Sequence, residues 1–156
     1  MAMGGARNRN TWIIKMEQFT RLRETDRSVL TELASTRQRR YCPHEDIICE
    51  GEHSPDIHLV LAGWACRYKI LTDGSRQIVS FFVPGDLCHP ETFILKELDH
   101  SIGTLTTSTI AAISGETLRD AMLKHPHSTV ALCSSTLIVE SLLAARLVDI
   151  GRRDAH

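Results

Sequence analysis

The spacing of apolar residues divides the chain into helical and strand-like stretches. Residues 11–19 and 24–35 carry apolar side chains at intervals of three and four, which is the period of an amphipathic helix. Thr25 or Asp26 is the expected N-cap of the second stretch, because a short side-chain oxygen accepts from the free amides of a first turn. We therefore predict two N-terminal helices.

From residue 37 to residue 114 the helical period gives way to a strand pattern. Four glycines recur there at intervals of 12, 11 and 11 residues: Gly51, Gly63, Gly74 and Gly85. The segments between them are rich in β-branched and aromatic residues, so we expect about eight short strands. The Asp73-Gly74 step predicts a two-residue hairpin with a type I′ turn. This rhythm favours a double-wound antiparallel jelly roll.

The pattern becomes helical again after residue 114. Residues 115–125 predict a short helix that ends before Pro126, because a proline disfavours the α conformation of the residue before it. Residues 127–151 then predict a helix of about 37 Å, at about 1.5 Å per residue, closed by Gly151.

Apolar residues cover more than one face of this long helix. One face is expected to dock on the roll and the other to meet the same helix of a second chain; burial within one monomer is the alternative. The residues expected at this homodimer interface are Leu132, Leu137, Val139, Leu143, Leu147 and Ile150.

Composition narrows the function classes. A net charge of −1 offers no field that would attract nucleic acid. No apolar run approaches the roughly 18 to 20 residues that span a bilayer, and the first ten residues lack the apolar stretch of a secretory signal. We therefore expect a cytoplasmic protein without a membrane partner. Its five scattered cysteines include no CxxC pair, which disfavours disulfides and structural zinc, so no cofactor is expected to be required for folding.

The order of these elements resembles the Crp/Fnr family of bacterial transcription regulators, over about residues 15 to 155. The resemblance is carried by Glu50-Gly51-Glu52, Gly63, Asp73-Gly74, Pro84-Gly85-Asp86, Asp99-His100-Ser101 and the final GRRDA at residues 151–155. It implies a β-roll that senses an effector, a long helix that forms a parallel dimer, and a C-terminal helix-turn-helix that reads DNA. The chain reaches His156 where that last part is expected to begin, so DNA is an expected partner only of a longer form.

The expected fold is therefore mainly β with flanking α. A double-stranded β-helix, or jelly roll, of the cyclic nucleotide-binding-like kind carries N-terminal helices and a long C-terminal helix. The boundaries expected are 1–36 for the N-terminal helices, 37–114 for the sensor core, 115–151 for the short and dimerisation helices, and 152–156 for the start of a DNA-binding domain.

The resemblance also implies an effector pocket after the turn at residues 84–86. Relatives that bind cyclic nucleotides carry a Gly-Glu pair there for the ribose and, about ten residues later, an Arg-Ser or Arg-Thr pair for the phosphate. Aligned from Gly85, these positions hold His89-Pro90 and His100-Ser101. Because histidine does not replace a permanent bidentate cation, we do not expect cyclic AMP binding in the usual manner. The expected pocket residues are Gly85, Asp86, Leu87, His89, Glu91, His100 and Ser101.

Two binding alternatives stay open at this pocket, and the effector itself is unknown. In a divergent cyclic nucleotide site, Glu91 would meet the ribose while Arg67 or Arg76 approaches from a neighbouring strand. In a haem site, Cys88 and His89 would be the ligands, as in a gas-sensing branch of the family. Adjacent strand residues point to opposite faces, so both reach one iron only where the strand bends.

An enzyme of the cupin class shares the roll but needs an HxH pair on a strand. The HxH of this chain, at residues 125–127, lies between two predicted helices. The remaining candidates are dispersed and are expected to be surface or hydrogen-bonded residues: His44, His53, His58, His89 and His100. We therefore expect no enzymatic activity and no metal site.

Overall fold

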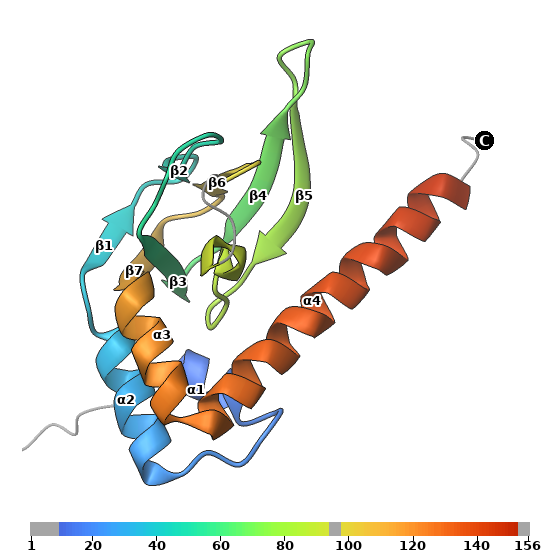
Figure 1. The fold of residues 1–156 in the computed structure, drawn as a ribbon. Helices are drawn as coiled ribbons and strands as arrows, with labels where there is room; N and C mark the ends of the chain where they lie inside the picture. The colour runs from blue at the N-terminus through green and yellow to red at the C-terminus, as the bar shows by residue number, and fades with distance from the viewer. Residues whose placement is uncertain (1–9, 94–97, 153–156) are drawn as a thin grey trace, which may run out of the picture.

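The computed structural model describes residues 10–93 and 98–152. Two small antiparallel sheets form a roll, helices gather at one end of it, and a long helix leaves that end (Figure 1). The helices are α1 (Thr11–Met16), α2 (Glu24–Ala34), α3 (Gly115–Lys124) and α4 (Pro126–Arg152), with a 3-10 turn η1 (Pro90–Phe93). The predicted fold class, a jelly roll with flanking helices, is confirmed.

The strands pair in two sheets of order β1-β7-β3 and β2-β6-β4-β5. They are β1 (Gln38–Tyr41), β2 (Asp46–Ile48), β3 (Asp56–Ala62), β4 (Ala65–Ile70), β5 (Arg76–Phe82), β6 (Ser101–Thr104) and β7 (Ser108–Ser114). Within the described ranges there are seven strands where about eight were expected. Leu87, after β5, adds an isolated bridge to Leu59 of β3.

The side chains of β3 point alternately to its two faces and so contribute to two separate hydrophobic clusters. Ile57 and Leu59 pack with residues of the helices, whereas Val60 packs in the interior of the roll with Ile110 of β7. Successive side chains of a strand point to opposite faces, so one strand serves both clusters. His58 shares the face of Val60, which directs a histidine into the roll.

The start of α2 differs from the prediction. The N-cap is Arg23, and Asp26 lies three residues further on, where its carboxylate accepts from the Arg23 amide at 2.8 Å. The other oxygen of Asp26 lies 3.0 Å from Nδ1 of His125, at the junction of α3 and α4. Asp26 therefore serves the first turn of α2 from its third position and also contacts His125, and the N-cap prediction of Thr25 or Asp26 is wrong.

The β4–β5 hairpin is confirmed, but its turn is not type I′. Gly74 has a φ of +82°, whereas Asp73 is not in the positive-φ region. The Leu71 amide donates to the Ser75 carbonyl at 2.8 Å, and the Gly74 amide donates to the Leu71 carbonyl at 2.9 Å. These bonds define a three-residue loop whose last residue is left-handed, the other common hairpin closure.

Helix α4 departs from its prediction in two respects. It continues through Gly151 to Arg152, so the predicted end is wrong. Its segment Pro126–Ile150 is also long and apolar enough to cross a membrane by length and composition, and only 11% of its most apolar stretch is buried. The expectation that no run is long enough is therefore wrong, although one such helix is weak evidence for a membrane span.

The predicted dimer stripe on α4 divides in the structure. Leu132 is buried in the chain's own core, so it is wrong as an accessible interface residue; it lies where α4 still packs on α1 and β3. Val139 and Leu143 are half-buried. Leu137, Leu147 and Ile150 are exposed by 66%, 71% and 74%. The N-terminal part of α4 belongs to the core, and the part beyond it keeps one face toward β5, where Arg146 lies over Phe81, and exposes the other (Figure 1).

Candidate functional site

A groove of about 590 Å³ lies between α4 and the segment that follows β5. On the roll side it is lined by Arg67, Pro90, Glu91 and Asp99. On the helical side its lining residues are Met122, Leu132, Cys133, Thr136, Leu137 and Glu140. The volume and the mostly apolar lining are typical of small-molecule sites.

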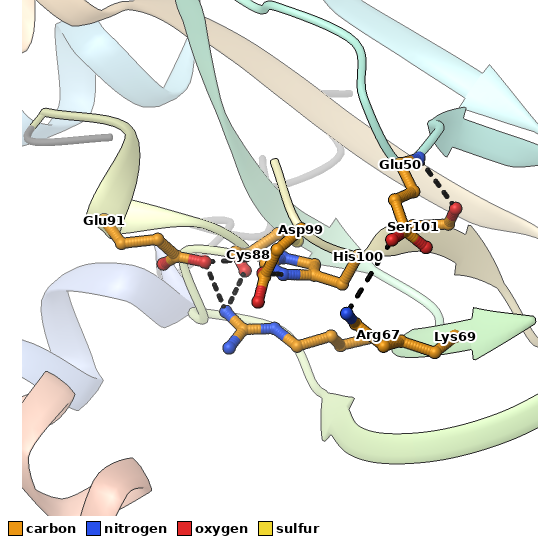
Figure 2. Close-up of polar contacts among 8 residues, drawn as sticks. All are labelled: Glu50, Arg67, Lys69, Cys88, Glu91, Asp99, His100 and Ser101. Carbon is orange, nitrogen blue, oxygen red and sulfur yellow. Dashed lines mark hydrogen bonds and ion pairs between the residues drawn. The ribbon is translucent and has the colours of Figure 1, made fainter. Parts of the chain in front are cut away.

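Arg67 is the central cation of this groove. It lies in β4, beside a register shift in the pairing with β5 between Arg67 and Tyr68. Its Nη2 donates to the Glu91 carboxylate at 2.9 Å and to the Cys88 carbonyl at 3.2 Å (Figure 2). One guanidinium therefore ties β4 to the segment in which the sequence predicted the pocket. Of the two arginines expected as alternatives, Arg67 reaches this segment, whereas Arg76 lies over the Tyr68 ring at 3.4 Å.

His100 occupies the position at which cyclic nucleotide-binding relatives are expected to carry arginine. Its Nδ1 lies 2.6 Å from the Asp99 carboxylate, and its Nε2 lies 3.4 Å from the Glu91 carboxylate. The hydrogen bond from His100 lowers the pKa of Asp99. The imidazole is buried and lies between two carboxylates of the same chain. These contacts take the place that a ligand phosphate would need.

Ser101 is engaged as well. Its hydroxyl accepts from the Glu50 amide at 2.9 Å, and the Glu50 carboxylate lies 3.7 Å from Lys69 Nζ (Figure 2). This contact fastens the turn at Glu50-Gly51 to β6. The serine of the predicted phosphate pair therefore has a structural partner.

The turn at residues 84–86 faces α1. The Asp86 carboxylate forms an ion pair with Lys15 and accepts from the Val83 amide at 2.9 Å. Gly85 has a φ of +94° and lies so close to α1 that an added Cβ would be 3.1 Å from the Thr11 carbonyl oxygen. Gly85 and Asp86 thus hold α1 against the roll, and Leu87 continues the strand-like pairing to Leu59.

His89 lies inside the roll rather than on the groove surface. Its Nε2 is 2.7 Å from Nδ1 of His58, and both rings are buried. Burial lowers the pKa of His58, and burial together with the neighbouring His58 lowers that of His89 to about 3. The pairing was missed in the sequence, although His58 lies within the apolar run of β3 and shares a face with Val60, which is a usable signal that its side chain is buried.

Cys88 and His89 do not fit the haem alternative. Both are fully buried, and burial raises the pKa of the Cys88 thiol, so the thiolate that binds iron is disfavoured. His89 is already engaged with His58. In the part of the chain that the structure describes, no group of three or more His, Cys, Asp or Glu residues is arranged to hold a metal ion.

The buried histidine pair makes stability depend on pH. A histidine with a lowered pKa in the folded state is protonated first in the unfolded state, so its contribution is complete above pH 6.5 and is lost as the pH falls toward about 3. From pH 7 to pH 5, His89 is expected to lower the free energy of unfolding by about 2 kcal/mol. Urea unfolding at both pH values measures this, and the His89→Gln variant should lose that much of the pH dependence.

The matched control for this prediction is His44→Asn, because His44 is exposed and has a left-handed φ of +61° that asparagine tolerates. Its pH dependence should equal that of the unmodified protein. Equal pH dependence in the His89→Gln and His44→Asn variants would contradict the prediction.

The roll and groove described above define a sensor domain of the cyclic nucleotide-binding type. The family model of the cyclic nucleotide-binding domain matches residues 38–125, which is more than half of the chain. The chain therefore belongs to this family. The Transcriptional activatory protein AadR of Rhodopseudomonas palustris is 43% identical over 47 residues, which are 30% of this chain and 20% of AadR. The chain spans about a fifth of the length of the curated relatives it matches.

Solved structures agree on the fold. FixK2 from Bradyrhizobium japonicum has a TM-score of 0.66 at 22% identity, covering 75% of this chain and 58% of FixK2. The catabolite activator protein of Thermus thermophilus has a TM-score of 0.66 at 19% identity, covering 87% of this chain and 62% of that protein. Together with the family match, these similarities confirm the sensing-domain fold of Crp/Fnr-type regulators.

Proposed function

We propose that this chain senses a small-molecule effector and transmits its binding to a second copy through α4. The observation that carries the proposal is the composition of the groove, whose walls come from both the roll and α4. A molecule bound there touches Arg67 and Glu91 on one side and Thr136 on the other. It can therefore shift the population of α4 orientations, which is how ligands act on two-state regulators.

In a longer form that carries a DNA-binding domain, α4 would lead directly into that domain. The effector would then control DNA binding, as expected for a Crp/Fnr-type transcription regulator. The family and fold are those of transcription regulators, which supports binding rather than catalysis as the activity and the cytoplasm as the location.

The test of the groove is a thermal-shift screen of a metabolite library, combined with mass spectrometry of any molecule that copurifies. Thr136→Arg fills the groove from α4, and Ser134→Arg adds the same side chain two residues away, at a position outside the groove lining. A binder is expected to stabilise the Ser134→Arg variant as it does the unmodified protein, but not the Thr136→Arg variant. The proposal fails if no compound in the library raises the melting temperature of the unmodified protein and the Thr136→Arg and Ser134→Arg variants respond alike.

Cyclic AMP and cyclic GMP are expected to give no saturable heat in isothermal titration calorimetry at millimolar concentration. The reason is that Arg67 is paired with Glu91, and His100 and Ser101 have partners within the chain. A charge-assisted pair lost at a phosphate weakens binding by about 1.5 to 3 kcal/mol. Saturable binding that the Arg67→Gln variant loses would instead support the divergent nucleotide pocket.

A further inference from the structure

A small, partly open cavity of about 40 Å³ adjoins the groove beneath α4. A molecule in the groove lies against the cavity, because the two share the lining residues Arg67, Pro90, Glu91, Leu132, Thr136 and Glu140. Helix α1 also lines the cavity through Trp12 and Met16, each 1% exposed. A water molecule takes up about 30 Å³ in the liquid, so the cavity accepts a water or one small terminal group.

Two hydrogen-bond donors at this cavity have no acceptor. Among residues 10–93 and 98–152, no group accepts from the buried indole Nε1–H of Trp12 or from the buried Nε–H of Arg67. Buried polar groups are nearly always paired, with protein or with a bound molecule. Because both orphan groups can only donate, the complementary group must be an acceptor.

The charges around the cavity are largely compensated. Arg67 is paired with Glu91, and Asp86 with Lys15. Glu140 lies at the exposed edge on α4 and, among the described residues, has no ion-pair partner. A ligand with a carboxylate would therefore be repelled by the Glu140 carboxylate, whereas a neutral carbonyl compound would not be.

We propose that the effector is a small molecule with an apolar body, which occupies the groove, and a carbonyl or carboxylate group, which accepts from Trp12 and Arg67 in the cavity. This inference rests on the proposed sensing function and assigns the class of ligand. An amine of the same shape is expected to bind poorly, because its ammonium group can only donate hydrogen bonds and would face the two N–H donors of Trp12 and Arg67.

Three compounds with the same aromatic body test the inference: phenylacetamide, phenylacetate and 2-phenylethylamine. The sequence contains two tryptophans, so the Trp64→Phe background leaves Trp12 as the fluorescent reporter. Phenylacetamide and phenylacetate are expected to bind saturably and to shift the Trp12 emission. 2-Phenylethylamine is expected to bind at least tenfold more weakly.

Variants then locate the acceptor. Trp12→Phe keeps an aromatic ring without the N–H, and Arg67→Lys keeps a cation for Glu91 without the Nε–H. Each is expected to weaken phenylacetamide binding about tenfold in calorimetry, as for the loss of one hydrogen bond. Circular dichroism checks their folding, and Arg67→Lys carries the test if Trp12→Phe does not fold. Glu140→Gln separates the two ligand forms, since it should tighten binding of phenylacetate and leave phenylacetamide unchanged.

The inference is overturned if neither carbonyl compound binds, if the amine binds as tightly, or if both donor variants retain full affinity, which would leave the cavity to a water molecule. A different ligand class that binds the Ser134→Arg but not the Thr136→Arg variant would overturn the inference while the proposed function stands. No binder of any class, with the two α4 variants behaving alike, would overturn both.

Discussion

The Gly63→Ala variant is expected to lose about 3 kcal/mol or more of its free energy of unfolding. Gly63 lies between β3 and β4 at a φ of +83°, a conformation that a side chain disfavours. An added Cβ would lie 2.3 Å from Ser108 Oγ and 2.4 Å from the Thr107 carbonyl oxygen. The second contact is with backbone, so a rotamer change does not relieve it. Urea unfolding monitored by circular dichroism measures the loss.

Gly74→Ala is the matched control, because Gly74 has nearly the same φ of +82° but nothing within 4 Å of an added Cβ. It carries the conformational penalty alone, expected at about 1 kcal/mol. The difference between the two variants is therefore the steric contribution of the turn before β7. A Gly63→Ala variant as stable as Gly74→Ala would show that Thr107 and Ser108 move aside.

The regular glycines explain why the roll was predictable. All four have φ between +82° and +94°. A left-handed residue is a local requirement that one residue type meets best, so its spacing marks the turns whatever lies around them. The type of each turn depends in addition on side-chain contacts with neighbouring residues. At Asp73 the hairpin closes with three residues instead of two, because its side chain accepts from the Ser75 amide at 2.8 Å and favours a right-handed turn before Gly74.

The segment predicted to form the pocket adjoins the groove of the structure, but the partners of its side chains could not be predicted from the sequence. The segment after Gly85 does adjoin the groove, through Pro90 and Glu91. The partners of its side chains come from distant elements, however. Arg67 reaches Glu91 across 24 positions, and His58 reaches His89 across 31. Such pairs depend on the packing of β3 and β4 against the segment, which no local pattern encodes.

Trp12 illustrates the same limit more strongly. In the sequence it is one apolar residue of a short helix. Its role at the cavity depends on the Lys15–Asp86 ion pair and the close approach of Gly85, which set α1 against the roll. The N-terminal helix is thereby a part of the site's wall, and the proposed ligand class follows from that contact.

Replacing both Leu137 and Val148 by glutamate is expected to convert a dimer into a monomer. The two residues are eleven positions apart, about three helical turns, so they lie on one face of α4. Both are exposed in the single chain, and the face extends to Val130, also exposed. Each large apolar side chain covered by a partner contributes about 1.5 to 3 kcal/mol, and in a parallel pair the new carboxylates would face each other. The dissociation constant of the dimer should rise at least about 100-fold, equivalent to about 3 kcal/mol.

Size-exclusion chromatography with light scattering at micromolar concentration measures this change, and circular dichroism checks that the roll remains folded. The matched control is Leu123→Glu, since Leu123 is 76% exposed but belongs to α3. This variant should stay dimeric, because its side chain lies on a different helix from the apolar face. A monomer in the unmodified protein would contradict the dimer, and binding of that monomer to lipid vesicles would assign the uncovered face of Pro126–Ile150 to a membrane instead. A dimer that survives both glutamates would place the interface elsewhere, and the groove would then have to act through a surface other than the exposed face of α4.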